Sequence, residues 1–275
     1  DPTIDFNLTP PTYSEVSKII YNMRSAASSC PADQISVIIL KRCPIIRTML
    51  WRVITECWEK KYIPTCWKNG VTVLAFKKGD NNNPENFRPI TLQPIFCKVF
   101  TSIMKKRIFT FLCDNGYIDL NIQKGFWQDM SGSIEHNARN KQRSLVISLI
   151  DLRNAFYEVN HRFLKAILSY HHLPEHMVDL IFSLYNDCKI SIATDNFLTN
   201  PIKVERGVLQ GDSLSPLLFN MCFNSLMITV KKERMKCLGY ILTQFNNSKH
   251  WQQLADDTAI VTALQSDNQK LLNLF

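Results

Sequence analysis

Two adjacent aspartates, Asp256 and Asp257, lie between short apolar arms in the segment QLADDTAIV. This pattern predicts a β-hairpin that carries the acidic pair at or near its turn. A turn aspartate usually only satisfies local backbone groups, which is the simpler interpretation of an isolated pair. A third carboxylate, Asp151, lies near the end of the nearly continuous apolar run LVISLIDL, residues 145–152. This run is too short for an ordinary helix and predicts a buried strand.

If that strand lies beside the hairpin, Asp151 converges on the acidic pair. Like charges held so close together need a cation, and carboxylate oxygens with open coordination positions suit Mg²⁺. Two such ions can activate an attacking hydroxyl and stabilise the leaving phosphate oxygen during phosphoryl transfer between nucleotides. The three aspartates therefore predict a metal-binding site.

Helices are predicted for most of the first 65 residues and for one later segment. TYSEVSKIIYNM has apolar residues on one helical face and offers Ser14 as a cap, and a second helix is predicted from Pro44 to Glu59. The apolar spacing of IFCKVFTSIMKKRIFTFL also predicts a helix.

A strand and a polar loop are predicted between these helices. GVTVLAF reads as a short apolar strand, and KKGDNNNPENFRP, rich in Asn and Pro, reads as a loop. Lys77 and Arg88 flank this loop, so two cationic side chains are expected at its base.

After Asp151 the apolar spacing predicts an amphipathic helix that includes Phe156, Val159 and Phe163 and packs back onto the sheet. Farther along, Ser215 is expected to cap another helix that has Pro216 in its first turn. The residues expected to approach another backbone closely ahead of that helix are Gly207 and Gly211.

Composition permits a nucleic-acid partner without requiring one. The chain has 275 residues and a net charge of +8, which suits a polyanionic partner. No apolar run approaches the roughly 18 residues of a membrane span, so we expect an intracellular protein without a membrane partner. Nine scattered cysteines without a C-x-x-C pair indicate reduced core thiols and no zinc site. Because the usual glycine-rich phosphate loops are absent, any nucleotide must be held differently.

Five segments in order resemble the successive motifs of the reverse transcriptase domain of non-LTR (LINE-type) retrotransposons. They are GVTVLAFKKGDNNNPENFRPITL, IQKGFWQDMSGSIEH, LIDLRNAFYEVNH, GVLQGDSLSPLLFN and LADDTAI. The resemblance implies an α+β right-hand polymerase with fingers and a palm built on a small antiparallel sheet, and with the thumb missing. It implies a helical extension of the fingers at residues 1–65, fingers at 66–144, and a palm at 145–275 truncated after the hairpin.

The resemblance also implies the catalytic residues and their cofactor. Asp151 and Asp256 match the family's metal-binding aspartates, and Asp257 completes the catalytic signature. The implied cofactor is a pair of Mg²⁺ ions, with Mn²⁺ as a substitute, and the implied partners are an RNA template, a DNA primer and dNTPs. The family further implies a nuclear location.

Five residues match the family's nucleotide-binding positions: Lys77, Arg88, Phe156, Gln210 and Gly211. The two cations fall where the fingers meet the triphosphate, and the bare glycine lets the base pair lie against backbone. The aromatic ring matches the position beneath the incoming ribose, although helix packing also explains its apolar spacing.

Further basic residues are candidates for contact with the template or other nucleic acid: Lys78, Lys105, Lys106 and Arg107. Lys78 also competes with Lys77 for the triphosphate role, and a solvated helix face is the simpler interpretation of the other three.

Two residues depart from the family pattern beside the site. Tyr157 stands where an Asp is usual, and Leu254 stands where an aromatic residue usually precedes the acidic pair. Neither replaces an expected metal ligand.

Two functions remain open. The three intact aspartates favour an RNA-directed DNA polymerase core, whereas the missing thumb favours a catalytically silent retroelement remnant that keeps the fold and some nucleic-acid binding.

Overall fold

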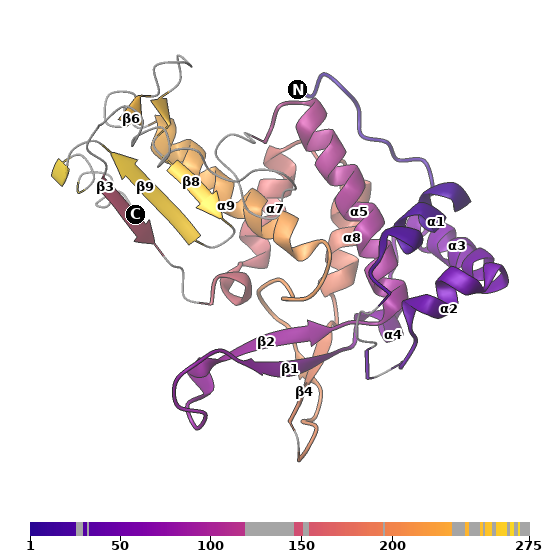
Figure 1. Ribbon diagram of the computed structural model, residues 1–275. Coiled ribbons are helices and arrows are strands. Elements are labelled where there is room, and N and C mark those ends of the chain that lie inside the picture. Colours follow the sequence, from indigo (N-terminus) through magenta and orange to yellow (C-terminus); the bar gives the residue numbers. More distant parts are fainter. Residues whose placement is uncertain are drawn as a thin grey trace. The chain divides into compact units, whose positions relative to one another are not determined.

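The computed structural model divides into two compact units, Asp1–Asn115 with Phe156–Leu218, and Gly116–Ala155 with Phe219–Phe275 (Figure 1). Each unit is described by itself. The residues that the structure describes are 1–25, 30–31, 33–118, 146–150, 154–194, 196–232, 240–241, 248–249, 251–254, 257–262, 265–266 and 269. Side chains are described for all of these except residues 146–150 and those between 226 and 262.

The first unit is mainly helical, with one mixed sheet. Its helices are α1 (Tyr13–Asn22), α2 (Val37–Arg42), α3 (Pro44–Glu59), α4 (Thr65–Lys68), α5 (Ile95–Asp114), α7 (His161–Tyr170) and α8 (Glu175–Tyr185). The single-turn 3₁₀ segments are η1 (Pro84–Asn86) and η2 (Ala155–Glu158). Helix α9 (Ser215–Lys232) begins in this unit and continues into the second.

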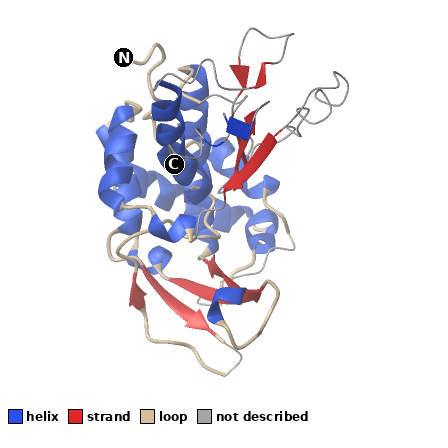
Figure 2. Cartoon of the chain, turned by 90° about the vertical axis from the view of Figure 1, so that its left-hand side faces the viewer, coloured by secondary structure: helices blue, strands red, loops and turns tan. Residues whose placement is uncertain are grey.

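The sheet of the first unit has the strand order β2-β1-β4-β5. Strands are drawn in red in Figure 2. Its strands are β1 (Gly70–Phe76), β2 (Phe87–Leu92), β4 (Lys189–Ala193) and β5 (Ile202–Lys203). β1 pairs antiparallel with β2 and parallel with β4. The β1–β2 hairpin extends beyond the helices of the unit (Figure 1). Because β2 is an edge strand, it accommodates Pro89, which has no N–H to donate.

The core of the first unit lies between α1, α3 and α5. Trp58 of α3 meets Phe100 of α5 edge to face, with ring centroids 6.3 Å apart. Both are buried, as are Ile20 of α1 and Met104 of α5. Burial of these large apolar side chains is the main stabilising contribution to the helical layer.

The second unit contains a three-stranded antiparallel sheet, in the order β3-β9-β8. Its strands are β3 (Val146–Ile150), β8 (Trp251–Leu254) and β9 (Asp257–Thr262). A separate strand pair is formed by β6 (Tyr240–Ile241) and β7 (Ser248–Lys249). The small antiparallel sheet and its hairpin confirm the sequence prediction for this segment.

Several predicted elements are confirmed with their bounds, and others need correction. Helix α3 has the predicted ends, and GVTVLAF is strand β1. Helix α1 is capped by Thr12, whose side chain accepts from the Glu15 N–H, so the prediction of Ser14 was wrong. The predicted loop after β1 is shorter than expected, because β2 already begins at Phe87.

The predicted helix after Asp151 begins later than expected. Asn160 caps α7 by accepting from the N–H groups of Arg162 and Phe163. Phe156 therefore lies in η2, outside the helix. Phe163 is within the helix but is 47% exposed, so it does not belong to the buried face.

The boundaries of fingers and palm expected from the sequence stay a prediction, because the two compact units describe contacts and not these subdomains. Residues on both sides of position 65 share the first unit, which also takes in Phe156–Leu218. None of the described helices is both long and apolar enough to cross a membrane.

Candidate nucleotide and metal site

The β8–β9 hairpin of the second unit forms as predicted. Leu254 pairs with Asp257, the first residue of β9. On the other side of β9, Ile150 at the end of β3 pairs with Thr258. Ile150 and Asp257 thus lie on neighbouring strands. Asp151 and Asp256 lie outside the described residues, and their role as metal ligands stays a prediction.

Lys77, Lys78 and Arg88 lie at the base of the β1–β2 loop in the first unit. The Lys77 N–H donates to the Asn86 carbonyl at 2.8 Å, which extends the hairpin by one pair, and Arg88 is paired with Ala75. All three basic side chains are exposed, and within the described part of the chain none has an ion-pair partner. Their charges are therefore available to a phosphate group.

The loop between these cations is ordered by its own polar residues. The Asp80 side chain accepts from the Asn82 N–H at 2.9 Å, and the Asn86 amide donates to the Asp80 carbonyl at 2.8 Å. Gly79 has a φ of +96°, a conformation that favours glycine. These contacts hold the turn from within.

Gln210 and Gly211 lie directly against strand β2. The Thr91 N–H donates to the Gln210 carbonyl at 2.7 Å, so this segment pairs with the outer edge of β2. Gly211 has a φ of +123°, and a Cβ atom there would lie 2.3 Å from the Thr91 carbonyl oxygen. The predicted close backbone approach at Gly211 is confirmed, with β2 as the neighbour.

Phe156 and Tyr157 are held by the same strand and by the segment that leads into Gln210. The Val208 N–H donates to the Phe156 carbonyl at 2.7 Å, and the Tyr157 hydroxyl donates to the Pro89 carbonyl at 2.9 Å. Burial raises the pKa of Tyr157 to about 12, so its hydroxyl remains a donor at neutral pH. The departure from the usual Asp thus adds a link between η2 and β2.

Gly207 completes this arrangement by direct contact with η2. It has a φ of +85°, and a Cβ atom there would lie 2.7 Å from the Tyr157 Cα. His161 also contacts its carbonyl at 2.9 Å. The structure therefore brings four predicted residues, Arg88, Phe156, Gln210 and Gly211, onto elements joined by short hydrogen bonds.

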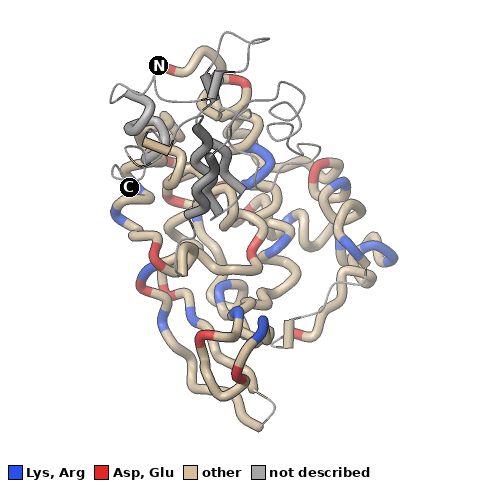
Figure 3. The backbone as a smooth tube through the Cα atoms, turned by 60° about the vertical axis from the view of Figure 1, so that its left-hand side comes forward, with Lys and Arg blue, Asp and Glu red and all other residues tan. Residues whose placement is uncertain are grey.

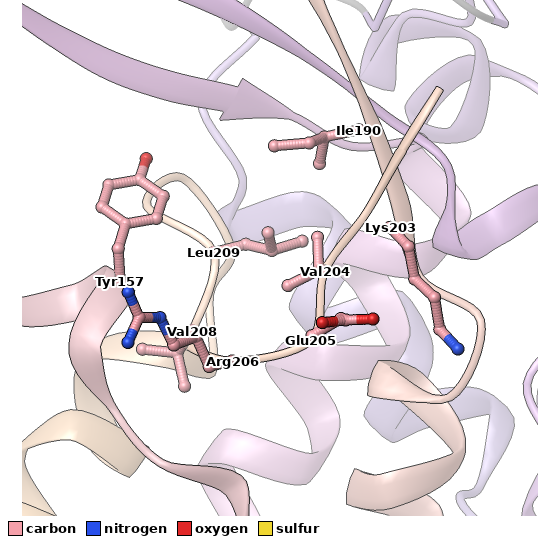
Figure 4. Close-up of a pocket in the computed structure, with 9 residues that line it drawn as sticks. Tyr157, Ile190, Lys203, Val204, Glu205, Arg206, Val208 and Leu209 are labelled. Carbon is pink, nitrogen blue, oxygen red and sulfur yellow. The ribbon is translucent and has the colours of Figure 1, made fainter. Parts of the chain in front are cut away.

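A pocket of about 320 Å³ opens beside these contacts (Figure 4). Tyr157 and Ile190 line it together with residues 203–209. Its walls are apolar at Val204, Val208 and Leu209, and Lys203 and Arg206 provide exposed cations at its edge. The sequence analysis did not predict this pocket, because its lining comes from three separate segments.

Asp212 is a residue that the sequence analysis missed. It is 4% exposed and accepts from the Thr101 hydroxyl at 2.7 Å and from the Leu214 and Ser215 N–H groups at 2.9 and 3.2 Å. Burial raises the pKa of this carboxyl, and these hydrogen bonds oppose the shift. Asp212, not Ser215, therefore provides the side-chain cap of α9.

The three consecutive basic residues of α5, Lys105, Lys106 and Arg107, do not form one positive face. Arg107 is engaged by both Glu15 oxygens at 3.0 and 2.7 Å and lies 4.6 Å from the Trp58 ring centroid, so it is not free to bind a phosphate. Lys105 is half-buried, and burial lowers its pKa, which Asp212 opposes. Lys106 is exposed and stays a candidate. Basic and acidic positions are interspersed along the described backbone (Figure 3).

Comparison with known proteins identifies the family of this chain. Residues 76–275 match the family model described as reverse transcriptase (RNA-dependent DNA polymerase). The chain belongs to the reverse transcriptase family. A solved structure of apo telomerase from Candida tropicalis, truncated from its C-terminal domain, is similar with a TM-score of 0.53 and 14% identity over 76% of this chain and 46% of that chain. This likeness fits the predicted α+β fold of fingers and palm.

Curated relatives are proteins of retrotransposons. The Pol polyproteins of the type-1 retrotransposable element R2 are 28% identical in Nasonia vitripennis, over 66% of this chain, and 30% identical in Popillia japonica, over 62%. The transposon TX1 149 kDa protein of Xenopus laevis is 24% identical over 76% of this chain. These names confirm the predicted resemblance to a non-LTR retrotransposon reverse transcriptase domain. The chain spans only 19%, 24% and 16% of these three relatives.

Proposed function

We propose that this chain is the catalytic core of an RNA-directed DNA polymerase that extends a DNA primer on an RNA template from dNTPs. The observation that carries the proposal is the strand register of the second unit. Ile150 pairs with Thr258, so the strand end before Asp151 lies beside the strand that follows Asp256 and Asp257. Membership of the reverse transcriptase family supports the same activity.

In this proposal Asp151 and Asp256 hold two Mg²⁺ ions, for which Mn²⁺ can substitute. Bound there, the ions would lower the pKa of the primer 3′-hydroxyl and stabilise charge on the transferred phosphate. Asp257, the first residue of β9, completes the catalytic signature and supports the site.

The first unit supplies the nucleotide contacts. Lys77 and Arg88 are exposed, so their charges can neutralise the triphosphate as the loop approaches it. Gln210 and Gly211 would lie beside the base pair, and the absence of a side chain at Gly211 lets their segment pack against β2. Phe156 has its own backbone fixed by Val208, which suits a rigid side chain beneath the ribose. Lys78 and Lys106 are exposed contacts for the template, and the proposed site of action is the nucleus.

Primer extension on an RNA template with Mg²⁺ and dNTPs tests the proposal. Asp256→Asn should reduce extension to background because the amide keeps a similar shape but loses the anionic ligand. Asp114→Asn, at an exposed position at the end of α5, is the matched control and should extend normally. Circular dichroism should show the same fold for both variants.

The alternative is a catalytically silent remnant of a retroelement. It predicts that the unaltered chain binds primer–template but shows no extension with either Mg²⁺ or Mn²⁺. Equal extension by the unaltered chain and by Asp256→Asn would instead remove Asp256 from the site.

A further inference from the structure

A second pocket in the first unit contains a buried amide with unmet hydrogen-bonding capacity. Gln93, the residue after β2, is only 1% exposed and lines a pocket of about 210 Å³. Neither its Oε1 nor its Nε2 atom has a hydrogen-bond partner among the described residues. Leaving such a group unsatisfied costs free energy, so a buried primary amide on a pocket wall points to a ligand that completes it.

The other residues around this pocket have a consistent chemistry. Cys30, Val37 and Ile95 are buried and form apolar walls. Polar groups come from Ser102 and Ser213, and two cations, Arg24 and Lys98, lie at its edge. The Lys41 ammonium donates to the carbonyl of Met23, a residue that lines the pocket, so a further positive charge lies beside it. Apolar walls, an amide and cations together suit a flat polar group that is attached to an anion.

The pocket lies next to the nucleotide-binding elements but uses different residues. Gln93 follows Thr91, whose N–H donates to the Gln210 carbonyl, by two positions. Ser213 follows Gly211 by two positions and lines this pocket. A nucleic-acid strand that passes the predicted nucleotide site can therefore reach the Gln93 pocket within a few nucleotides.

We propose that the Gln93 pocket takes one unpaired base of a single-stranded nucleic acid, and that the Gln93 amide bonds to the edge of that base. Every base edge offers a donor and an acceptor that a primary amide can match, and the apolar walls suit the faces of the ring. Lys98 and Arg24 contact the adjoining phosphates. The inference rests on the proposed polymerase function, because it identifies the bound strand as part of the template.

A free nucleoside triphosphate fits this pocket less well than a base within a strand. The volume of about 210 Å³ is below the roughly 300 Å³ at which pockets for whole drug-sized ligands begin. Only two cations line it, whereas the exposed Lys77 and Arg88 are on another part of the unit. A single base, with its phosphates outside, matches both the size and the charge.

Gln93→Met tests the proposal through two readouts that move in opposite directions. Methionine keeps a similar length but removes both hydrogen-bonding groups. The melting temperature should rise by roughly 2–4 °C because the unsatisfied buried amide is gone. Affinity for an RNA–DNA hybrid with a single-stranded 5′ RNA overhang should fall roughly tenfold, since two hydrogen bonds to the base are lost.

An abasic scan on the unaltered chain gives an independent test that needs no variant. Fluorescence anisotropy, without dNTPs, would measure binding of hybrids in which one abasic residue is moved along the overhang. We expect a roughly tenfold loss at one position only. Gln93→Met should show no such position. If water alone bonds to the Gln93 amide, affinity will not depend on the position of the abasic residue, and Gln93→Met will bind as the unaltered chain does. That result would overturn the proposal.

Charge controls separate the pocket from general attraction. Lys98→Ala should lower the slope of log affinity against log salt by about one, as expected for one lost phosphate contact. Lys60→Ala removes an exposed cation directly after α3 that lines neither pocket, and it should leave the slope of log affinity against log salt unchanged. Equal effects of the two substitutions would count against a phosphate next to Lys98.

Failure of this inference is distinguishable from failure of the polymerase proposal. If primer extension fails but the position-specific abasic effect persists, the pocket stands and the polymerase activity does not. If extension succeeds while the abasic scan is flat, only the pocket inference is overturned.

Discussion

Gly211→Ala is expected to destabilise the first unit strongly, because the added methyl group would meet backbone. A Cβ atom at this position would lie 2.3 Å from the Thr91 carbonyl oxygen. That oxygen cannot move aside easily, since the Thr91 N–H is bonded to Gln210 and Thr91 is paired with Thr72 on β1. The overlap therefore has to be relieved by separating the Gln210 segment from β2.

Two contributions add up to the expected loss of unfolding free energy in Gly211→Ala. A φ of +123° is unfavourable for alanine, and such strained conformations cost roughly 1–3 kcal/mol. Overpacking against a neighbour that cannot relax costs a further ~1–3 kcal/mol. Gly79 provides a matched control in the same unit, with a φ of +96° and a close neighbour that is the Asn86 side chain instead of backbone. Gly79→Ala should therefore show mainly the cost of the unfavourable φ.

Urea denaturation followed by circular dichroism measures both variants. Gly211→Ala should lower the free energy of unfolding by roughly 2–6 kcal/mol, and it should exceed Gly79→Ala by at least ~1 kcal/mol. The denaturant slope should be unchanged if the native unit stays compact. Equal destabilisation by the two substitutions would refute the argument that contact with Thr91 requires glycine.

Three further predictions follow from individual contacts. Arg107→Leu should cost roughly 1–3 kcal/mol in unfolding free energy because it leaves the partly buried Glu15 carboxylate without its partner, whereas Lys106→Ala should change stability by no more than ~0.5 kcal/mol but weaken RNA binding. Denaturation and binding curves measured in parallel would show the reverse pattern if Arg107 were the nucleic-acid contact. The Tyr157 pKa of about 12 lies above its ordinary value of 10.0, so its contribution to the free energy of unfolding is complete below pH 10 and is lost as the pH rises towards 12. Tyr157→Phe should lose less stability than the unaltered chain over that interval, and identical curves of stability against pH would contradict this. Phe156→Ala should raise incorporation of rNTPs relative to dNTPs in primer extension, and an unchanged ratio would assign Phe156 to packing alone.

Sequence periodicity predicted the regular elements of this chain well. The bounds of α3 follow from a continuous apolar pattern after a proline, and the hairpin of β8 and β9 follows from two apolar arms around an acidic pair. Both signals are local, so they can be read without knowledge of the tertiary structure. The position of Asp257 at the start of β9 was predictable for the same reason.

Caps and charge partners were less predictable, because each depends on a choice between neighbouring polar residues. Thr12 and Asp212 were both passed over in favour of a serine nearer the helix. Asp212 additionally needs Thr101, which is 111 positions away. Arg107 looked like one of three equivalent basic residues, yet its position on α5 directs it to Glu15 and Trp58. Helical geometry separates consecutive side chains by about 100°, so a run of charges in sequence is not a charged face.

Tyr157 illustrates how a departure from a family motif can be understood from geometry. The family pattern has an Asp at this position, beside the predicted site but not among its expected metal ligands. The structure gives the residue another function, since its hydroxyl reaches the Pro89 carbonyl next to Arg88, and its backbone lies against Gly207. One side chain thus joins the segment after Asp151 to the strand that carries a predicted triphosphate contact. A change that alters chemistry beside the site while strengthening its support is compatible with retained activity, and primer extension decides between the two functions.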